Sequence, residues 1–143
     1  MTVARILAFK GPEVFTASPH RTMAEIVALL AEKRIGTVVI AGADGGISGI
    51  ISERDVVRSL AARGADVLAD PVSMHMTRKV VTATADETIE EIMDRMTEGK
   101  FRHVPVVEGR RLVGIVSIGD VVKHRMAMAE AEASAMRDYI ATA

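Results

Sequence analysis

The chain is 143 residues long and 49% apolar, which is enough for a hydrophobic core of ordinary single-domain size. Its 18 basic and 19 acidic residues leave a net charge of −1, so the composition gives no general attraction to nucleic acid or to an anionic membrane. The absence of cysteine excludes disulfides, thiolate zinc sites and a cysteine nucleophile. The apolar run 3–9 is too short for a signal peptide, so we expect a cytoplasmic protein.

The first predicted elements are a strand, a helix and a β-hairpin. Residues 14–16 are expected to be extended, and Thr22 stands three residues before Glu25, a pairing that caps a helix start. Apolar residues at three-and-four spacing then predict a helix with one buried face, which Gly36 should end. Residues 37–40 and 47–51 read as two strands joined by the turn 44–46.

A second helix is predicted to begin after Ser52, which stands three residues before Asp55, and to end near Gly64. The connecting segment 64–79 contains Pro71 and a short helical turn at 72–76. The counterpart of that turn before the first unit is the segment 3–7. The first unit therefore reads strand, helix, strand, strand, helix.

The whole unit then occurs a second time, with one loop a residue shorter. Corresponding positions are Thr16 and Thr82, Thr22 and Thr88, Glu25 and Glu91, Gly49 and Gly114, Ser52 and Ser117, and Asp55 and Asp120. Two copies of a unit that is too small to close its own core predict one body with pseudo-twofold symmetry. We expect a first repeat at 1–66, a second repeat at 67–126 and a helical extension at 127–143.

The recurring Gly-x-x-Ser-x-x-Asp segment places a hydroxyl and a carboxylate where a strand becomes a helix. Taken alone, Ser-x-x-Asp is a capping box. The same place also suits a nucleotide, because helix amides bind phosphate and an aspartate accepts hydrogen bonds from ribose hydroxyls. The glycine lets a ligand approach the strand backbone closely. Because the whole arrangement recurs, the sequence favours nucleotide binding.

The element order, the two Gly-x-x-Ser-x-x-Asp segments and the Arg-His-Val-Pro-Val-Val segment at 102–107 resemble a tandem pair of CBS domains, or Bateman module. The resemblance covers residues 3 to about 123. It implies an α+β fold of two pseudo-twofold-related β-α-β-β-α repeats, each with a small three-stranded sheet. It also implies a homodimeric sensor that binds AMP, ADP, ATP, NAD(H) or S-adenosylmethionine between the repeats.

In the family that the chain resembles, each cleft combines residues of both repeats. The resemblance thus implies a first cleft of Ser52, Arg54, Asp55, Thr82, Phe101, Arg102 and His103, and a second cleft of Ser117, Asp120, Thr16, Ile35, Gly36 and Thr37. Cations converge only on the first, so we expect it to bind a phosphate-bearing nucleotide more tightly. The alternative for Arg102 and His103 is an exposed helix end.

The C-terminal segment 120–143 has no proline or glycine after the capping region and is rich in alanine, methionine and glutamate, which predicts one long helix. Its apolar positions alternate spacings of four and three: Val122, Met126, Ala129, Ala133, Met136 and Ile140. That period is typical of a coiled-coil seam, which would extend a homodimer interface. The alternative is a helix folded back over its own module.

Two other functional classes compete with the sensor. An enzyme is not favoured, because the four histidines lack the spacing of metal ligands and no nucleophile or phosphate-loop motif is present. We expect no metal and no catalytic cofactor. A dimerisation adaptor without a ligand is the second rival. A sensor of energy or redox state would signal through its dimer interface or an unidentified effector protein.

Overall fold

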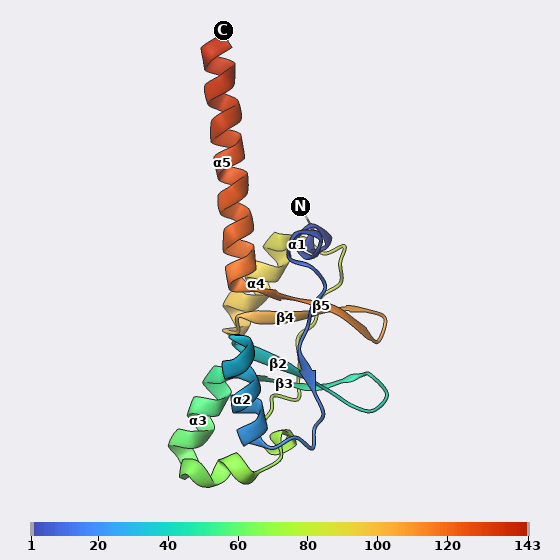
Figure 1. The fold of residues 1–143 in the computed structure, drawn as a ribbon. Helices are drawn as coiled ribbons and strands as arrows, with labels where there is room; N and C mark the ends of the chain where they lie inside the picture. The colour runs from blue at the N-terminus through green and yellow to red at the C-terminus, as the bar shows by residue number, and fades with distance from the viewer. Residues whose placement is uncertain (1, 143) are drawn as a thin grey trace.

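The computed structural model describes residues 2–142, and it is an α+β protein with two small sheets stacked between helices (Figure 1). The elements in chain order are α1 (Val3–Lys10), β1 (Thr16–Ala17), α2 (Met23–Lys33), β2 (Thr37–Ala41), β3 (Ile47–Ser52), α3 (Glu53–Arg63), the 3₁₀ turns η1 (Gly64–Ala69) and η2 (Val72–Met74), α4 (Ile89–Gly99), β4 (His103–Glu108), β5 (Arg111–Ser117) and α5 (Ile118–Thr142). None of the helices within 2–142 has the length and hydropathy of a membrane-spanning helix.

The two sheets have the same plan, but the second is reduced. In the first sheet β1 runs parallel to β2, which pairs antiparallel with β3. In the second, β4 and β5 pair antiparallel, and the expected third strand is a single bridge between Ala83 and Val106. The strand stops there because the Thr84 amide donates to Glu87 Oε2 (2.8 Å) instead of continuing the ladder.

The predicted helix starts are confirmed by their capping geometry. Thr22 and Thr88 each form a reciprocal capping box with the glutamate three residues later, and Ser52 forms one with Asp55. The expected end of α2 at Gly36 is wrong. Arg34 instead takes the left-handed conformation (φ 54°) directly after Lys33, and its amide bonds the Leu30 carbonyl, which ends the helix earlier.

The two hydrophobic cores exchange their lead-in segments. The core around β2 and β3 contains Val72 and Met76 from the segment before the second repeat. The core around β4 and β5 contains Val3 and Ile6 from α1, at the start of the chain. Since each core needs a segment from beside the other repeat, the two repeats form one body.

Two glycines show that the lead-in segments are equivalent. A Cβ added at Gly49 would lie 2.6 Å from Met76 Sδ, and one added at Gly114 would lie 2.6 Å from Leu7 Cδ2. Each glycine thus gives a lead-in side chain the space to pack directly on a strand. Leu7 and Met76 occupy the same place in the two halves, and Lys10 and Lys79 follow them at the same distance along the chain.

Candidate functional site

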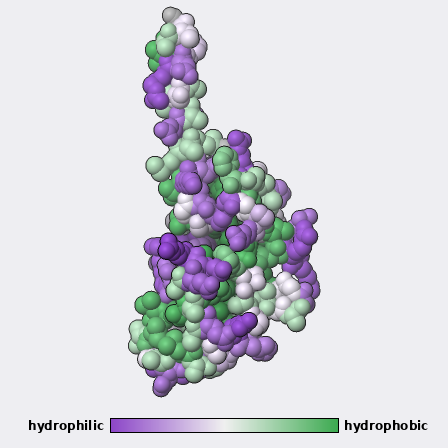
Figure 2. Space-filling view, in the orientation of Figure 1, coloured by the Kyte–Doolittle hydropathy of each residue, from purple (hydrophilic) through white to green (hydrophobic). Residues whose placement is uncertain are grey.

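A groove of about 580 Å³ lies between the repeats. The first repeat lines it with residues 36–37, 50, 52–55 and 58, and the remaining wall consists of residues 77, 79–81 and 99–103. The beginning of α3 and the loop before β4 therefore face the same space. In the space-filling view, hydrophilic side chains gather at the level where the two repeats meet (Figure 2).

Most residues predicted for the first cleft line this groove. Ser52, Arg54, Asp55, Phe101, Arg102 and His103 are all in its wall. Gly36 and Thr37, which were expected in the second cleft, lie here as well. Thr82 is not in the lining, and its carbonyl accepts a hydrogen bond from Arg95 Nη1 (3.3 Å).

One carboxylate oxygen of Asp55 caps α3, and the other faces Arg58. Its Oδ2 accepts hydrogen bonds from the Ser52 amide (2.9 Å) and the Ser52 hydroxyl (3.0 Å). Its Oδ1 lies 3.9 Å from Arg58 Nη1, and the side chain is 19% exposed. The cap therefore uses only Oδ2 and leaves Oδ1 without a hydrogen bond to the cap.

The groove wall is rich in positive charge. It contains five lysines and arginines against two carboxylates; the basic residues are Arg54, Arg58, Lys79, Lys100 and Arg102. Arg58, Lys79 and Lys100 were missed in the sequence. Arg58 had a readable signal, because it lies one helical turn after Arg54 and so shares its face. This balance suits a ligand that carries negative charge.

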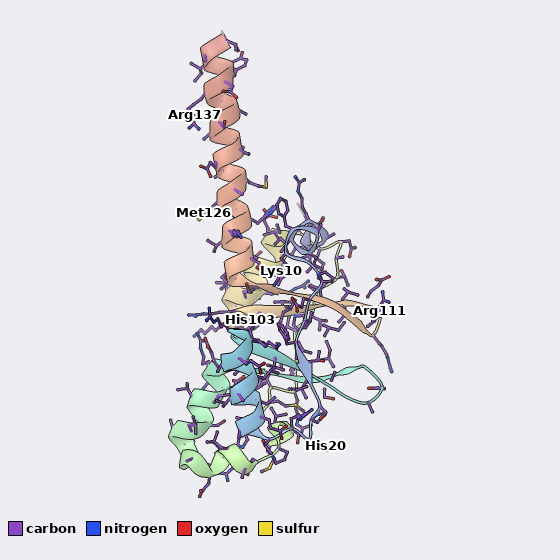
Figure 3. The ribbon with its side chains drawn as sticks, viewed as in Figure 1. Lys10, His20, His103, Arg111, Met126 and Arg137 are labelled. Carbon is purple, nitrogen blue, oxygen red and sulfur yellow. The ribbon has the colours of Figure 1, made fainter. Side chains whose placement is uncertain are left out.

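His103 connects the two halves of the site. Its Nδ1 lies 2.9 Å from the Thr37 hydroxyl, so a side chain of the second repeat is bonded to one of the first. Burial lowers the pKa of His103, and the positive charge of Lys10 lowers it further, while Asp120 and Glu53 partly oppose these effects. Figure 3 shows His103 where the two sheets meet, below Lys10.

The free energy of unfolding of the wild type is expected to fall more below about pH 6.5 than that of His103→Gln. The folded pKa of His103 is lowered, so between the two pKa values the unfolded chain binds more protons. The stabilising contribution of neutral His103 is thus complete above the unfolded pKa and is lost as the pH falls toward the folded pKa. Urea unfolding of both proteins at about pH 7.5 and about pH 5.5 measures the difference, and an identical pH dependence would contradict it.

In the second repeat, α1 occupies the place that corresponds to the groove. Lys10 Nζ donates to Asp120 Oδ2 (2.7 Å) and to the Ile115 carbonyl (2.9 Å), while Leu7 packs over Gly114. Burial would raise the pKa of Asp120, but hydrogen bonds from Lys10 and Ser117 outweigh it and hold the pKa below its usual value. Asp120 is therefore an ionised partner of Lys10, and both side chains remain partly exposed.

The first half differs because its lead-in segment is extended at this point. Thr77 pairs with Ile50 through two backbone hydrogen bonds (2.8 and 2.9 Å), and η2 has already ended at Met74. In the second half, α1 remains helical to Lys10, which turns its ammonium group onto Asp120. The pseudo-twofold symmetry thus fails at the two aspartates.

The remaining predicted residues of the second cleft are dispersed. The Ser117 hydroxyl accepts a hydrogen bond from the Asp120 amide (3.1 Å), and the Ser117 amide donates to Asp120 Oδ2 (2.9 Å), which is the predicted cap. Thr16 lines a separate groove with α2 and the loop between β2 and β3. Ile35 packs against the core of the first repeat.

In each repeat, the loop before the hairpin is tied in the same way to the first residue of the helix after the hairpin. The Glu53 amide donates to the Gly36 carbonyl (2.9 Å), and the Ile118 amide donates to the Arg102 carbonyl (2.8 Å). The wall of the groove is therefore bonded to the first residue of α5. Within residues 2–142, no three histidine or acidic side chains cluster as metal ligands would.

The model of the CBS domain matches residues 9–62 and 70–127. The chain belongs to the CBS-domain family. Among its relatives, the 17.7 kDa protein in the bps2 3′ region of Acidianus ambivalens is 33% identical over 112 residues, which are 78% of this chain and 66% of that protein. The CBS pair thus spans about two thirds of that relative's length.

Solved CBS structures share the fold. ATU1752 from Agrobacterium tumefaciens has 45% identity and a TM-score of 0.85, over 87% of this chain and 92% of its own. PAE2072 from Pyrobaculum aerophilum, solved with AMP, has 27% identity and a TM-score of 0.75, over 84% and 89%. The CBS pair of MJ0100, solved with 5′-methylthioadenosine and S-adenosyl-L-methionine, has 28% identity and a TM-score of 0.80, over 90% and 98%.

Proposed function

We propose that this CBS pair is a non-enzymatic regulatory module that binds an adenosine nucleotide in the groove beside Asp55. The observation that carries the proposal is the second oxygen of Asp55, at a helix start, in a groove lined by cations from both repeats. The ligand class is AMP, ADP, ATP or NAD(H), which would make the module a sensor of energy or redox state. Its cytoplasmic location stays a prediction from the sequence.

The groove residues have distinct proposed roles. Asp55 Oδ1 accepts hydrogen bonds from the ribose hydroxyls, as acidic residues do in dinucleotide folds. The first amides of α3 and the basic side chains bind phosphate, since helix starts favour anions. The aliphatic surface of Ile50, Val80 and Val81 covers the base. One nucleotide would thereby contact both repeats at once.

The relatives support an adenosine ligand and leave its remainder open. PAE2072 was solved with AMP, and MJ0100 with 5′-methylthioadenosine and S-adenosyl-L-methionine. All three ligands contain adenosine, but S-adenosylmethionine carries a positive sulfonium instead of a phosphate. The five basic side chains of this groove favour the phosphate-bearing class, because like charges repel.

Isothermal titration calorimetry and thermal unfolding with AMP, ADP, ATP, NAD, NADH and S-adenosylmethionine test the proposal. We expect a phosphate-bearing nucleotide to bind at one molecule per chain and to raise the melting temperature by mass action. S-adenosylmethionine is expected to bind more weakly. If none of these compounds binds, the adaptor without a ligand replaces the sensor; if a bound nucleotide is hydrolysed during the titration, the module is an enzyme.

A further inference from the structure

Most of α5 lies outside the folded module. The helix runs for 25 residues, from Ile118 to Thr142, and projects away from both sheets (Figure 1). Val121 is buried in the second core, whereas every described residue from Arg125 onward is exposed. The structure therefore has the projecting arrangement of the tail and not the folded-back one.

The projecting part carries an apolar stripe on a side that its own module leaves open. Val122, Met126, Met136 and Ile140 have exposed fractions of 46, 67, 61 and 67%. In proteins most of the stability of a helix comes from packing of an apolar face, and nothing in the described part of its own module packs on this one. The stripe therefore needs a partner.

The heptad positions of the stripe identify what a partner helix must offer. Met126, Ala133 and Ile140 take the a positions, and Val122, Ala129 and Met136 take the d positions. Both central layers are alanine, which lets two helices approach closely but only if the opposing residues are also small. A second α5 in the same register meets this requirement.

The charged residues that flank the stripe favour one orientation of that second helix. In a parallel pair each g residue faces the e residue five positions later on the other helix. Arg125 would then face Glu130 of the second copy, and Glu132 would face Arg137 of the second copy. Twofold symmetry forms each ion pair twice.

The antiparallel pairing of the same stripe produces repulsion instead. In an antiparallel pair, e residues face e residues and g residues face g residues of the other helix. Glu130 would then face Glu130 of the second copy, and Glu132 would face Glu132 of the second copy. Lys123 would face Arg137. Like charges in these positions disfavour the pairing.

We propose that α5 forms a parallel two-stranded coiled coil with α5 of a second copy of this chain, which places both CBS pairs at the same end of the dimer. Val122 and Ile140 mark the two ends of the seam. The proposal does not depend on the ligand, because the whole seam lies on α5, outside the residues that line the groove.

Cysteine cross-linking tests both the contact and its orientation, because the chain contains no cysteine of its own. In a parallel coil Ala129→Cys lies opposite itself, so oxidation is expected to give a disulfide-linked dimer. Ala131→Cys, on the outward face of the same helix, is the matched control and should remain monomeric on a denaturing gel. If Ala129→Cys links no more than Ala131→Cys, the proposal is overturned. A link that forms only between Ala129→Cys and Ala133→Cys would establish the antiparallel pair instead.

A charge exchange provides an independent readout in the absence of nucleotide. Glu130→Arg turns both Arg125 pairs repulsive, and we expect the dimer dissociation constant to rise by about tenfold in sedimentation analysis. The double variant Arg125→Glu/Glu130→Arg restores opposite charges and should recover the wild-type constant. A constant that Glu130→Arg leaves unchanged, or that the exchange does not recover, would contradict the parallel register.

Discussion

Asp55→Ala is expected to weaken binding of the nucleotide roughly 100-fold, which corresponds to about 2.7 kcal/mol. The variant removes the charged acceptor that we assign to the ribose hydroxyls. Hydrogen bonds to an ionised group contribute more than neutral ones, and a bound hydroxyl without its acceptor loses solvation as well. Calorimetric titration of the variant with the nucleotide that binds the wild type measures the effect.

Asp120→Ala is the matched control for this experiment. Both aspartates accept a hydrogen bond from the amide of the serine three residues earlier, at 2.9 Å in each case. Each alanine variant therefore loses an equivalent hydrogen bond at its helix start, which costs about 1 kcal/mol of stability, and Asp120→Ala also loses its ion pair with Lys10. Affinity should stay within about threefold in Asp120→Ala. An equal loss of affinity in both variants would show that the effect comes from the fold and not from the groove.

Lys10→Ala is expected to add a second, weaker nucleotide site, so that the stoichiometry rises from one to two per chain. In the wild type a ligand at Asp120 must first displace the ammonium group that lies 2.7 Å from its carboxylate. Removing that group leaves the carboxylate without its ion-pair partner and makes it available to ribose. Titration to millimolar nucleotide measures the stoichiometry.

Lys79→Ala separates this effect from a general loss of positive charge. Lys79 occupies the place of Lys10 in the other half, but it lines the open groove. Its removal should weaken the first site and create no second one. If Lys10→Ala keeps the stoichiometry at one, Lys10 is not what closes that half; if it weakens binding, Lys10 contacts the ligand itself.

The sequence predicted well what depends on neighbouring residues. The three helix caps read from Thr22, Ser52 and Thr88 are present, because a capping box involves residues only three positions apart. The long helix after Ser117 is present for a similar reason, since a run of strong helix formers needs no tertiary partner to be recognised. The repeat itself predicted the paired architecture.

The difference between the two halves was not predictable in the same way. Lys10 and Asp120 lie 110 positions apart, so no local pattern connects them. Their contact arises because α1 stays helical to Lys10 while the equivalent segment at Thr77 pairs with a strand. Thr37 likewise lies at the first groove because it bonds His103 across the pseudo-twofold axis. Such placements depend on packing between the repeats.

The hydrogen bond between the Arg102 carbonyl and the Ile118 amide couples the wall of the groove to α5. The loop that would contact a bound nucleotide is hydrogen-bonded to the first residue of this helix, which is a rod about 37 Å long. Tilting such a rod by about 10° moves its far tip by about 6 Å. A small shift of the Arg102 loop would therefore reach the far end of α5 as a much larger displacement.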